Sequence, residues 1–270
     1  MKNSILVFLV LAVLTGTTLY AQPEFTLTES GDTINLTDES GQKQGFWETK
    51  VRNITSRGNY VDDLKEGTWT SYHPRGFLSK LENYTQGMKN GIFVTIDTRG
   101  YLTKEEFYKD DKLNGLAISY KYGGNPIRKV NYKDGIKHGK SELYYENSKL
   151  QESSNYIDGQ RDGLTNWYDM AGNMIAEFNY KKGIFDGVQK TFYENDSLQS
   201  IEYYENNISQ GEFHEFWDNG MPKTTGLYED GLKEGKWQEY NEDGILAKET
   251  RYKKGVIKSE NVYIEEADDN

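Results

Sequence analysis

Three histidines, His73, His138 and His214, are the side chains in this 270-residue protein that are best suited to acid–base or metal chemistry. A 24-residue repeat runs through the sequence, and the three histidines occupy three different positions within it. A metal site or a catalytic triad needs its side chains to converge, and no common register brings these three together. The sequence therefore predicts no metal site and no histidine-based catalysis.

Other signals of catalysis are weak as well. The chain contains no cysteine, so it has no thiol nucleophile and no disulfide framework. It has no Gly-x-Ser-x-Gly elbow, no His-Glu-x-x-His motif and no phosphate-binding loop. Acidic turns such as 218–220 and 242–244 end in Asp/Asn-Gly, which is ordinary hairpin chemistry, and they lack the spaced carboxylates of a calcium loop. No pair of carboxylates stands out as those of a glycosidase would. We predict that the protein is not an enzyme and holds no cofactor.

The repeat must position any functional residue. Its phrase is Tyr-x-x-Gly-x-x-x-Gly, as in the stretch from Tyr84 to Gly91. We take the second Gly as the origin of each unit; the first interval between origins is 22 residues and the next seven are 24 residues each. A Tyr stands seven residues before every origin from Gly67 onward. The origins are Gly45, Gly67, Gly91, Gly115, Gly139, Gly163, Gly187, Gly211 and Gly235.

The residue four before each origin is usually Gly, and its exceptions are informative. Asp63, Asp111 and Asn207 replace it in three units. Asp and Asn are the residues that best tolerate a left-handed backbone after Gly, so the position is predicted to have a positive φ. Together with a polar turn about nine residues after the origin, this pattern divides each unit into two short, aromatic-rich strands joined as a β-hairpin.

Hairpins of this kind are not stable alone and must pair side by side. We predict an all-β fold: an elongated, single-layer, twisted antiparallel sheet of stacked β-hairpin repeats with a period of 24 residues. About 18 strands at roughly 4.8 Å spacing give a sheet on the order of 85 Å long. Aromatic ladders between neighbouring hairpins should stabilise it in place of a globular core.

Two aromatic positions of the repeat lie three residues apart, an odd number. One lies two residues after the origin, as in Trp69 and Trp237, and the other lies five after it, as in Tyr72 and Tyr240. In a regular strand they would face opposite sides of the sheet. Either a β-bulge re-aims one of them or both faces carry aromatic rings, and the sequence leaves both alternatives open.

This pattern resembles the MORN repeat (membrane occupation and recognition nexus), in its bacterial variant form, some members of which are described as antitoxin-like. The unit from Tyr228 to Tyr240, with Gly231, Gly235 and Trp237, follows the family pattern Tyr-x-x-Gly-x-x-x-Gly-x-Trp-x-x-Tyr throughout. The resemblance covers roughly residues 41–259. It implies an elongated sheet of hairpins with an interaction role, and it carries over no catalytic residues.

The two ends of the chain differ from the repeats, which we place at 45–259. Residues 1–21 read as a signal peptide: Lys2 precedes the apolar run from Ile5 to Leu14, which is too short to span a bilayer, and Ala21 suits cleavage before Gln22. Residues 22–44 read as an N-terminal cap hairpin. Residues 260–270 read as a cap strand followed by an acidic tail that keeps the sheet edge from pairing with other copies.

Charge limits the partners. The chain has 32 basic and 43 acidic residues and a net charge of −11, which disfavours nucleic acid and anionic lipid. After removal of the signal segment no stretch is apolar enough to cross a membrane. We therefore expect an exported protein in the periplasm, at the cell surface or secreted.

The function expected from these features is interaction with a protein partner or scaffolding in the cell envelope. The alternatives are a glycan- or peptidoglycan-binding module and an immunity or antitoxin-like partner of an exported toxin. Aromatic positions that recur in every unit are needed by the fold, so the candidate interaction surface consists of aromatic residues outside the repeat pattern. These residues are Tyr145, Trp167, Tyr193 and Trp217.

Overall fold

A computed structural model describes residues 23–263. This part of the chain consists of strands joined by turns and contains no helix, so no helix in it could cross a membrane. The predicted all-β sheet of stacked hairpins is confirmed. The predicted signal segment 1–21 lies outside the described residues, as does the acidic tail beyond Tyr263.

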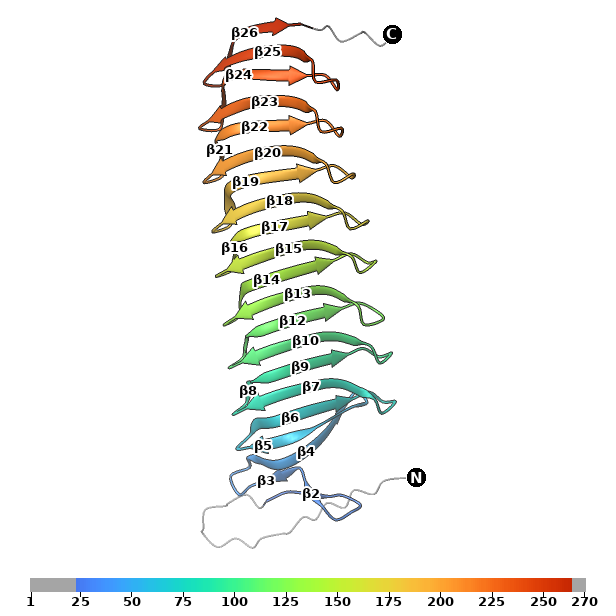
Figure 1. The fold of residues 1–270 in the computed structure, drawn as a ribbon. Helices are drawn as coiled ribbons and strands as arrows, with labels where there is room; N and C mark the ends of the chain where they lie inside the picture. Colours follow the sequence, from blue (N-terminus) through green and yellow to red (C-terminus); the bar gives the residue numbers. More distant parts are fainter. Residues whose placement is uncertain (1–22, 264–270) are drawn as a thin grey trace.

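The strands follow one another along the sheet in chain order (Figure 1). The first half comprises β1 (Thr26–Leu27), β2 (Thr33–Ile34), β3 (Leu36–Thr37), β4 (Lys43–Val51), β5 (Ile54–Val61), β6 (Leu64–Tyr72), β7 (Leu78–Thr85), β8 (Met88–Lys89), β9 (Gly91–Ile96), β10 (Leu102–Lys109), β11 (Lys112–Leu113), β12 (Gly115–Tyr120) and β13 (Pro126–Lys133). The second half comprises β14 (Ile136–Tyr144), β15 (Leu150–Ile157), β16 (Gln160–Arg161), β17 (Gly163–Tyr168), β18 (Met174–Lys181), β19 (Ile184–Phe192), β20 (Leu198–Glu205), β21 (Ile208–Ser209), β22 (Gly211–Phe216), β23 (Pro222–Glu229), β24 (Leu232–Tyr240), β25 (Leu246–Lys253) and β26 (Val256–Val262).

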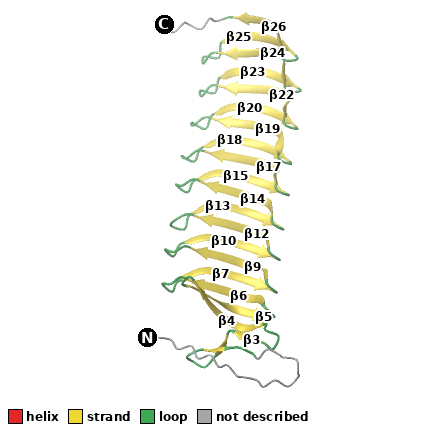
Figure 2. Cartoon of the chain, turned by 180° about the vertical axis from the view of Figure 1, so that it is seen from behind, coloured by secondary structure: helices red, strands yellow, loops and turns green. Residues whose placement is uncertain are grey.

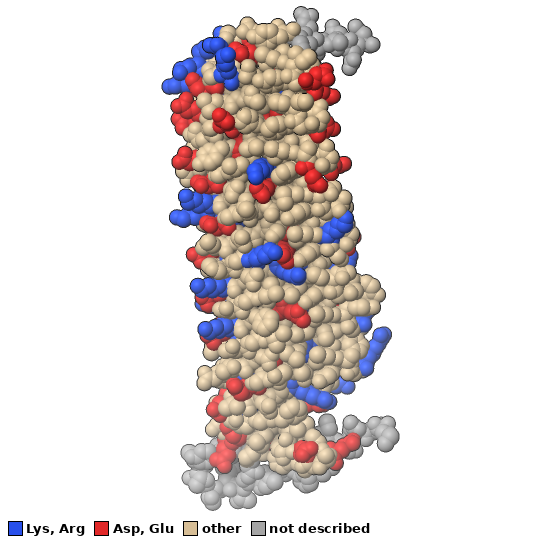
Figure 3. All heavy atoms as spheres, viewed as in Figure 1, with Lys and Arg blue, Asp and Glu red and all other residues tan. Residues whose placement is uncertain are grey.

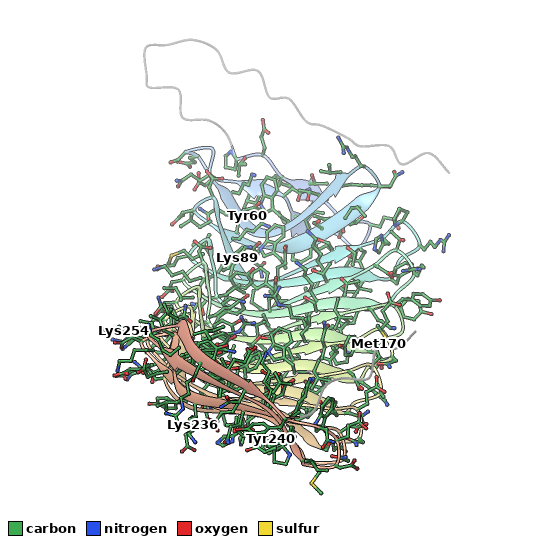
Figure 4. All side chains as sticks on the ribbon, turned by 90° about the horizontal axis from the view of Figure 1, so that it is seen from above. Tyr60, Lys89, Met170, Lys236, Tyr240 and Lys254 are labelled. Carbon is green, nitrogen blue, oxygen red and sulfur yellow. The ribbon has the colours of Figure 1, made fainter. Side chains whose placement is uncertain are left out.

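Every pairing in the sheet is antiparallel, from β3–β4 at one end to β25–β26 at the other. The paired strands are consecutive in the chain or separated by one two-residue strand, as in β7–β9 and β10–β12. The sheet is open, and its first and last strands lie at opposite ends of the molecule (Figure 1). Successive hairpins are rotated relative to one another, which gives the fanned appearance of Figure 4. Local pairing alone therefore produces the elongated shape.

One long edge of the sheet carries the tight links between units, and we call it the link edge. Each link is a two-residue turn: Asp62 and Asp63 both have positive φ, 50° and 64°, and Val61 pairs directly with Leu64. This geometry is a type I′ turn, which matches the twist of the flanking strands. The predicted positive φ four residues before the origin is correct, also at Asp111 and Asn207. The link is shorter than the Gly-x-x-x-Gly spacing suggests, because the strand already begins three residues before the origin.

The opposite edge carries longer turns, and we call it the turn edge (Figure 2). The turn from His73 to Phe77 closes with a hydrogen bond from the His73 amide to the Phe77 carbonyl at 2.9 Å, and Gly76 has a φ of 87°. Beyond this turn Tyr72 pairs with Leu78 and Ser71 with Lys80, so Ser79 is an extra residue in β7. The equivalent register shift occurs in later units, including β24–β25. The turn edge thus combines a fixed turn with a β-bulge.

The alternatives left open for the two aromatic positions are settled by β6. At the turn edge the bulge lies in β7, and β6 pairs with β7 without a break from Gly67 to Ser71. The register shift between β6 and β5 amounts to two residues, so it does not exchange the faces. Trp69 lies against Gly58, whereas Arg57, the residue before that glycine, lies over the ring of Tyr72. Trp69 and Tyr72 therefore point to opposite faces, and both faces of the sheet carry aromatic rings.

Candidate interaction surface

The face that holds Trp69 carries an aromatic ladder, and we call it the ladder face. Tyr60 lies between Trp47 and Trp69, with ring centroids 5.7 and 4.8 Å away in edge-to-face geometry. Tyr228 and Trp237 repeat this contact at 4.9 Å near the other end of the sheet. Such aromatic pairs each contribute about 0.5–1.5 kcal/mol beyond the area they bury. The repeated rings therefore join neighbouring hairpins.

Cations cover these rings. The ammonium of Lys65 lies 4.5 Å from the centroid of Trp69 and 4.7 Å from that of Tyr84, the tyrosine of the next unit. Burial lowers the pKa of Lys65, and burial together with the nearby Glu82 carboxylate raises the pKa of Tyr84 to about 12. The same cation–π contact recurs at Lys43, Lys89, Lys137 and Lys233. The π faces of the ladder are thus occupied from within the chain.

The ladder is interrupted in the middle of the sheet. Small or polar side chains stand there at the position two after the origin, including Thr165, which is fully buried. Its neighbour Arg161 donates to Glu152 at 2.6 Å and lies over the rings of Tyr156 and Tyr180. Glu152 is itself buried. A buried ion pair therefore joins these hairpins where the indole or phenyl rings are missing.

Three of the four aromatic residues singled out from the sequence tie turns together. The hydroxyl of Tyr145 donates to the carbonyl of Tyr168 at 2.8 Å, and that of Tyr193 donates to Phe216 at 2.7 Å. The indole of Trp217 donates to the carbonyl of Tyr240 at 3.1 Å. Each bond reaches from one unit to the strand end that precedes the turn of the next, so these three side chains line the turn edge without converging.

Trp167, the fourth of these residues, lies nearer the middle of the sheet. It pairs across strands with Glu152 on one side and Ala176 on the other. The guanidinium of Arg161 lies 5.7 Å from its ring centroid. Trp167 is therefore part of the packing around the buried ion pair, apart from the turn residues.

The three histidines do not come together. His73 packs on Phe77 with ring centroids 4.8 Å apart, in the first of the long turns. His138 lies 3.7 Å from Asp158, and His214 lies 3.2 Å from Glu212, each in a different unit. Between residues 23 and 263, no group of three or more His, Asp or Glu side chains is arranged to hold a metal ion.

An exposed row of apolar side chains follows the link edge. Lys65 points to the ladder face, so its neighbour Leu64 points to the second face. In seven of the nine units from Leu64 to Val256, the residue three before the origin is apolar. We call this set the apolar row, and its members are between 37% and 57% exposed: Leu64, Met88, Ile136, Ile184, Ile208, Leu232 and Val256. Lys112 and Gln160 occupy the two remaining units. The sequence analysis missed this row, although its 24-residue period is visible there.

Each member of the apolar row sits beside the link of the next unit. A Cβ at Gly159 would lie 3.2 Å from Ile136, and one at Gly255 would lie 3.4 Å from Leu232. Near the N-terminal end, Val61, Leu64 and Met88 line a recess of about 650 Å³, together with acidic side chains. The row is thus a fixed, shallow surface that the links hold in place.

Charges surround this surface without forming a basic patch. Acidic and basic side chains alternate along the link edge, as the left side of Figure 3 shows. Met170, at a turn, and Lys254, at a link, mark the two opposite edges in Figure 4. The turn edge changes sign along its length: Arg75, Arg99 and Lys121 lie near the N-terminal end, and acidic turns follow toward the C-terminal end.

Comparison with known proteins supports the repeat assignment. Residues 137–158, 185–206 and 233–254 match the MORN repeat variant. A search of curated proteins finds no match. Solved structures that resemble the chain include the TcdB2–TccC3 complex, at 12% identity and a TM-score of 0.22, and a Photorhabdus luminescens Tc holotoxin pore, at 12% identity and a TM-score of 0.18. Each alignment covers 84% of this chain and 15% of the other, so this chain spans a small part of those proteins.

The three matched segments each begin just after a link and run through one hairpin of the sheet, from β14 to the link after β15 in the first case. The repeat type points to binding or interaction. Three segments of the chain therefore match the MORN repeat variant, in agreement with the resemblance seen in the sequence.

Proposed function

We propose that this chain is an exported, non-catalytic protein that binds another protein in the cell envelope, and that the apolar row is its binding surface. The row carries the proposal because it places seven exposed apolar side chains at a fixed spacing along one edge of an acidic molecule. Regular apolar side chains that the fold does not bury are typical of interaction sites.

The spacing of the row suits one kind of partner. Neighbouring units stand about 9.6 Å apart, because each contributes two strands at roughly 4.8 Å. Seven residues of an α-helix rise about 10.5 Å, close to this value. An extended strand covers the distance in about three residues, an odd number that turns successive contact residues to opposite faces. The row therefore fits an amphipathic helix with an apolar residue at every seventh position.

The row is most regular between β19 and β26, where Ile184, Ile208, Leu232 and Val256 come from consecutive units. The four side chains of this stretch span three intervals, or about 29 Å. In an α-helix, two residues that are 21 positions apart in the sequence are separated by about 31.5 Å along the axis. The mismatch is small enough for side chains to absorb. A helix of about 22 residues or more would use the whole of this stretch.

The binding proposal is tested by affinity capture of the tagged protein, cross-linked in the envelope of its own host, with mass spectrometry of what is retained. The informative variant is Ile208→Glu/Leu232→Glu, which places two charges in the centre of the row. Its matched control is Met170→Glu, because Met170 is 69% exposed at the opposite edge.

We expect one stoichiometric protein partner with the wild-type chain and with Met170→Glu, and none with the double variant. A partner that the double variant still retains would exclude the apolar row as the binding surface. Turnover of a substrate by the purified protein at enzyme-like rates would contradict the non-catalytic assignment.

Export rests on the first 21 residues, where Lys2, the apolar run from Ile5 to Leu14 and Ala21 form the pattern of a cleaved signal. N-terminal sequencing of the protein from fractionated cells should give a chain that begins at Gln22 outside the cytoplasm. A cytosolic chain that begins at Met1 would overturn this part of the proposal.

A glycan is the second candidate ligand, favoured by aromatic rings along the turn edge. Tyr122 is 59% exposed, packs on Tyr101 in tilted geometry with centroids 4.5 Å apart, and has the Arg99 guanidinium 4.3 Å from its own centroid. Tyr145, Trp167, Tyr193 and Trp217 belong to the same hypothesis. Retention on cell-wall glycan that is lost in Tyr122→Ala would support it, and absence of retention would remove it.

A further inference from the structure

Each member of the apolar row has a direct cross-strand neighbour on the other side of its link. Near the N-terminal end these neighbours are uncharged: Val61 lies opposite Leu64, and Thr85 lies opposite Met88. In the four consecutive units near the C-terminal end they are charged. Lys181 lies opposite Ile184, Glu205 opposite Ile208, Glu229 opposite Leu232 and Lys253 opposite Val256. Directly opposite residues point to the same face of a sheet, so these four charges lie beside the apolar row.

The signs of these charges follow an order along the link edge: basic, acidic, acidic, basic. The first residue of each link turn agrees with it, with one neutral member: Lys182, Asn206, Asp230 and Lys254. Along the left side of Figure 3, between β18 and β26, blue, red and blue groups follow one another in this order. A partner that lies along the apolar row therefore meets negative charge over its centre and positive charge at both ends.

The charges are open to a partner. Glu205 and Glu229 are exposed, and no ion pair involves either of them within residues 23–263. Lys253 contacts Glu234 at 3.1 Å, but its side chain is 67% exposed and its ammonium has three donors, so it also has room for a second carboxylate. Asp186 lies two residues after Ile184 on the same face and offsets only part of the charge of the basic link beside it.

We propose, resting on the helix-binding function above, that the partner helix carries charges in the complementary order: acidic, basic, basic, acidic. Each charged residue of the link edge stands one strand spacing, about 4.8 Å, from its member of the apolar row. Three or four residues of an α-helix rise about 4.5–6 Å and stay on one side of the helix. The partner therefore has an apolar residue at every seventh position and a charged residue three or four positions from each.

Other occupants do not match this order. In a second copy of this chain stacked antiparallel on the same surface, Lys181 would face Lys253 and Glu205 would face Glu229. In a parallel arrangement each charge would face its own copy. A uniformly basic helix would suit the centre and would be repelled at both ends. Like charges that face each other across an interface cost several kcal/mol, so the mixed order selects a mixed helix.

The test uses two synthetic peptides of about 30 residues, long enough for a stable helix of mainly Ala and Gln. Both have Leu at every seventh position and the same composition, with two Glu and two Lys at the charged positions. One has the order Glu, Lys, Lys, Glu, and the other has Lys, Glu, Glu, Lys. Because their net charges are equal, the acidic character of the whole chain favours neither.

Fluorescence anisotropy of the labelled peptides, titrated with the full chain at low salt, measures their affinities. The first peptide should bind about tenfold tighter or more, because four attractive contacts replace four repulsive ones. The difference should shrink at about 0.5 M salt, since the contacts lie at the surface.

Reversing the order on the protein should reverse the preference. Lys181→Glu/Glu205→Lys/Glu229→Lys/Lys253→Glu does so without changing the net charge, and circular dichroism and Tm check that it is folded. The matched control makes four equivalent reversals at exposed positions of the turn edge and should leave the preference unchanged: Arg75→Glu/Lys149→Glu/Glu194→Lys/Asp218→Lys.

The outcomes separate this inference from the function on which it rests. Equal binding of the two peptides, lost in Ile208→Glu/Leu232→Glu, would overturn the charge order and leave the apolar row as the binding surface. A preference that the four reversals at the link edge do not change would also overturn it, as would binding that survives Ile208→Glu/Leu232→Glu. If neither peptide binds at about 100 μM, helix binding by the row fails and the charge order fails with it.

Discussion

The indole ring of Trp69 lies directly on the backbone of Gly58, in the strand beside it, and donates to the carbonyl of Asn59 at 3.0 Å. A Cβ at Gly58 would overlap the ring. Trp237 lies on Gly226 in the same way and donates to Leu227 at 3.2 Å. In both units a glycine makes room for the largest side chain of the ladder, and both indoles are only 3% exposed.

Gly58→Ala should destabilise the protein by about 1–3 kcal/mol through overpacking against the Trp69 ring. Backbone strain adds nothing, because the φ of Gly58 is not in the left-handed region. Urea unfolding measures the loss. The same substitution in a Trp69→Leu background should cost clearly less, because the clash is then removed. Equal losses in both backgrounds would show that the ring and the glycine are not coupled.

Gly91→Val should be more harmful than Gly235→Val. Both glycines have positive φ, 104° and 67°, which costs a β-branched residue about 1–3 kcal/mol. A Cβ at Gly91 would in addition approach Asn83 to 3.3 Å, whereas none lies within 4 Å at Gly235. Melting temperatures of the two variants test this order. An unchanged Tm in either one would contradict the backbone conformation described here.

Arg161→Met should destabilise the middle of the sheet by about 2–3 kcal/mol, because it leaves the buried carboxylate of Glu152 without its cation. The value lies below that for a fully buried pair, because Arg161 is 30% exposed. Arg161→Met/Glu152→Met should recover most of the loss. If the double variant is as unstable as the single one, cation–π packing matters more than the ion pair.

Alkaline pH should weaken the fold through Tyr84. Its pKa is raised to about 12 in the folded chain, mainly by burial and then by Glu82, against about 10 when unfolded. Between these values the folded state holds a proton that the unfolded state has lost. The resulting stability is therefore complete below pH 10 and is lost as pH rises to about 12. The free energy of unfolding should fall across this window and fall less steeply in Tyr84→Phe. An identical slope in that variant would contradict the assignment.

Trp217→Phe should remove the bond to the Tyr240 carbonyl and cost about 0.5–1.5 kcal/mol, measured by urea unfolding. Capture of a protein partner should be unaffected, because the apolar row lies at the other edge. Loss of the partner with unchanged stability would instead favour an interaction surface at the turn edge, and Tyr193→Phe would then be the next variant to examine.

The sequence by itself determined the fold because its pattern is local. Every strand pairs with neighbours in the chain, so Tyr seven before the origin and Gly at the origin already specify strand, link and register. The positive φ of Asp63, Asp111 and Asn207 was predictable for the same reason, since only a few residue types tolerate that backbone. The absence of a convergent histidine cluster also followed from repeat positions alone.

Only the tertiary structure decided what each side chain touches. The sequence offered Tyr145, Trp167, Tyr193 and Trp217 as a candidate surface. The structure adds that three of them donate to carbonyls at strand ends of the next unit, 23 residues on. It did not reveal the apolar row, because exposure depends on how each link packs on its neighbour. Nor did it show that Gly58 faces Trp69, since that contact depends on the register shift between β5 and β6.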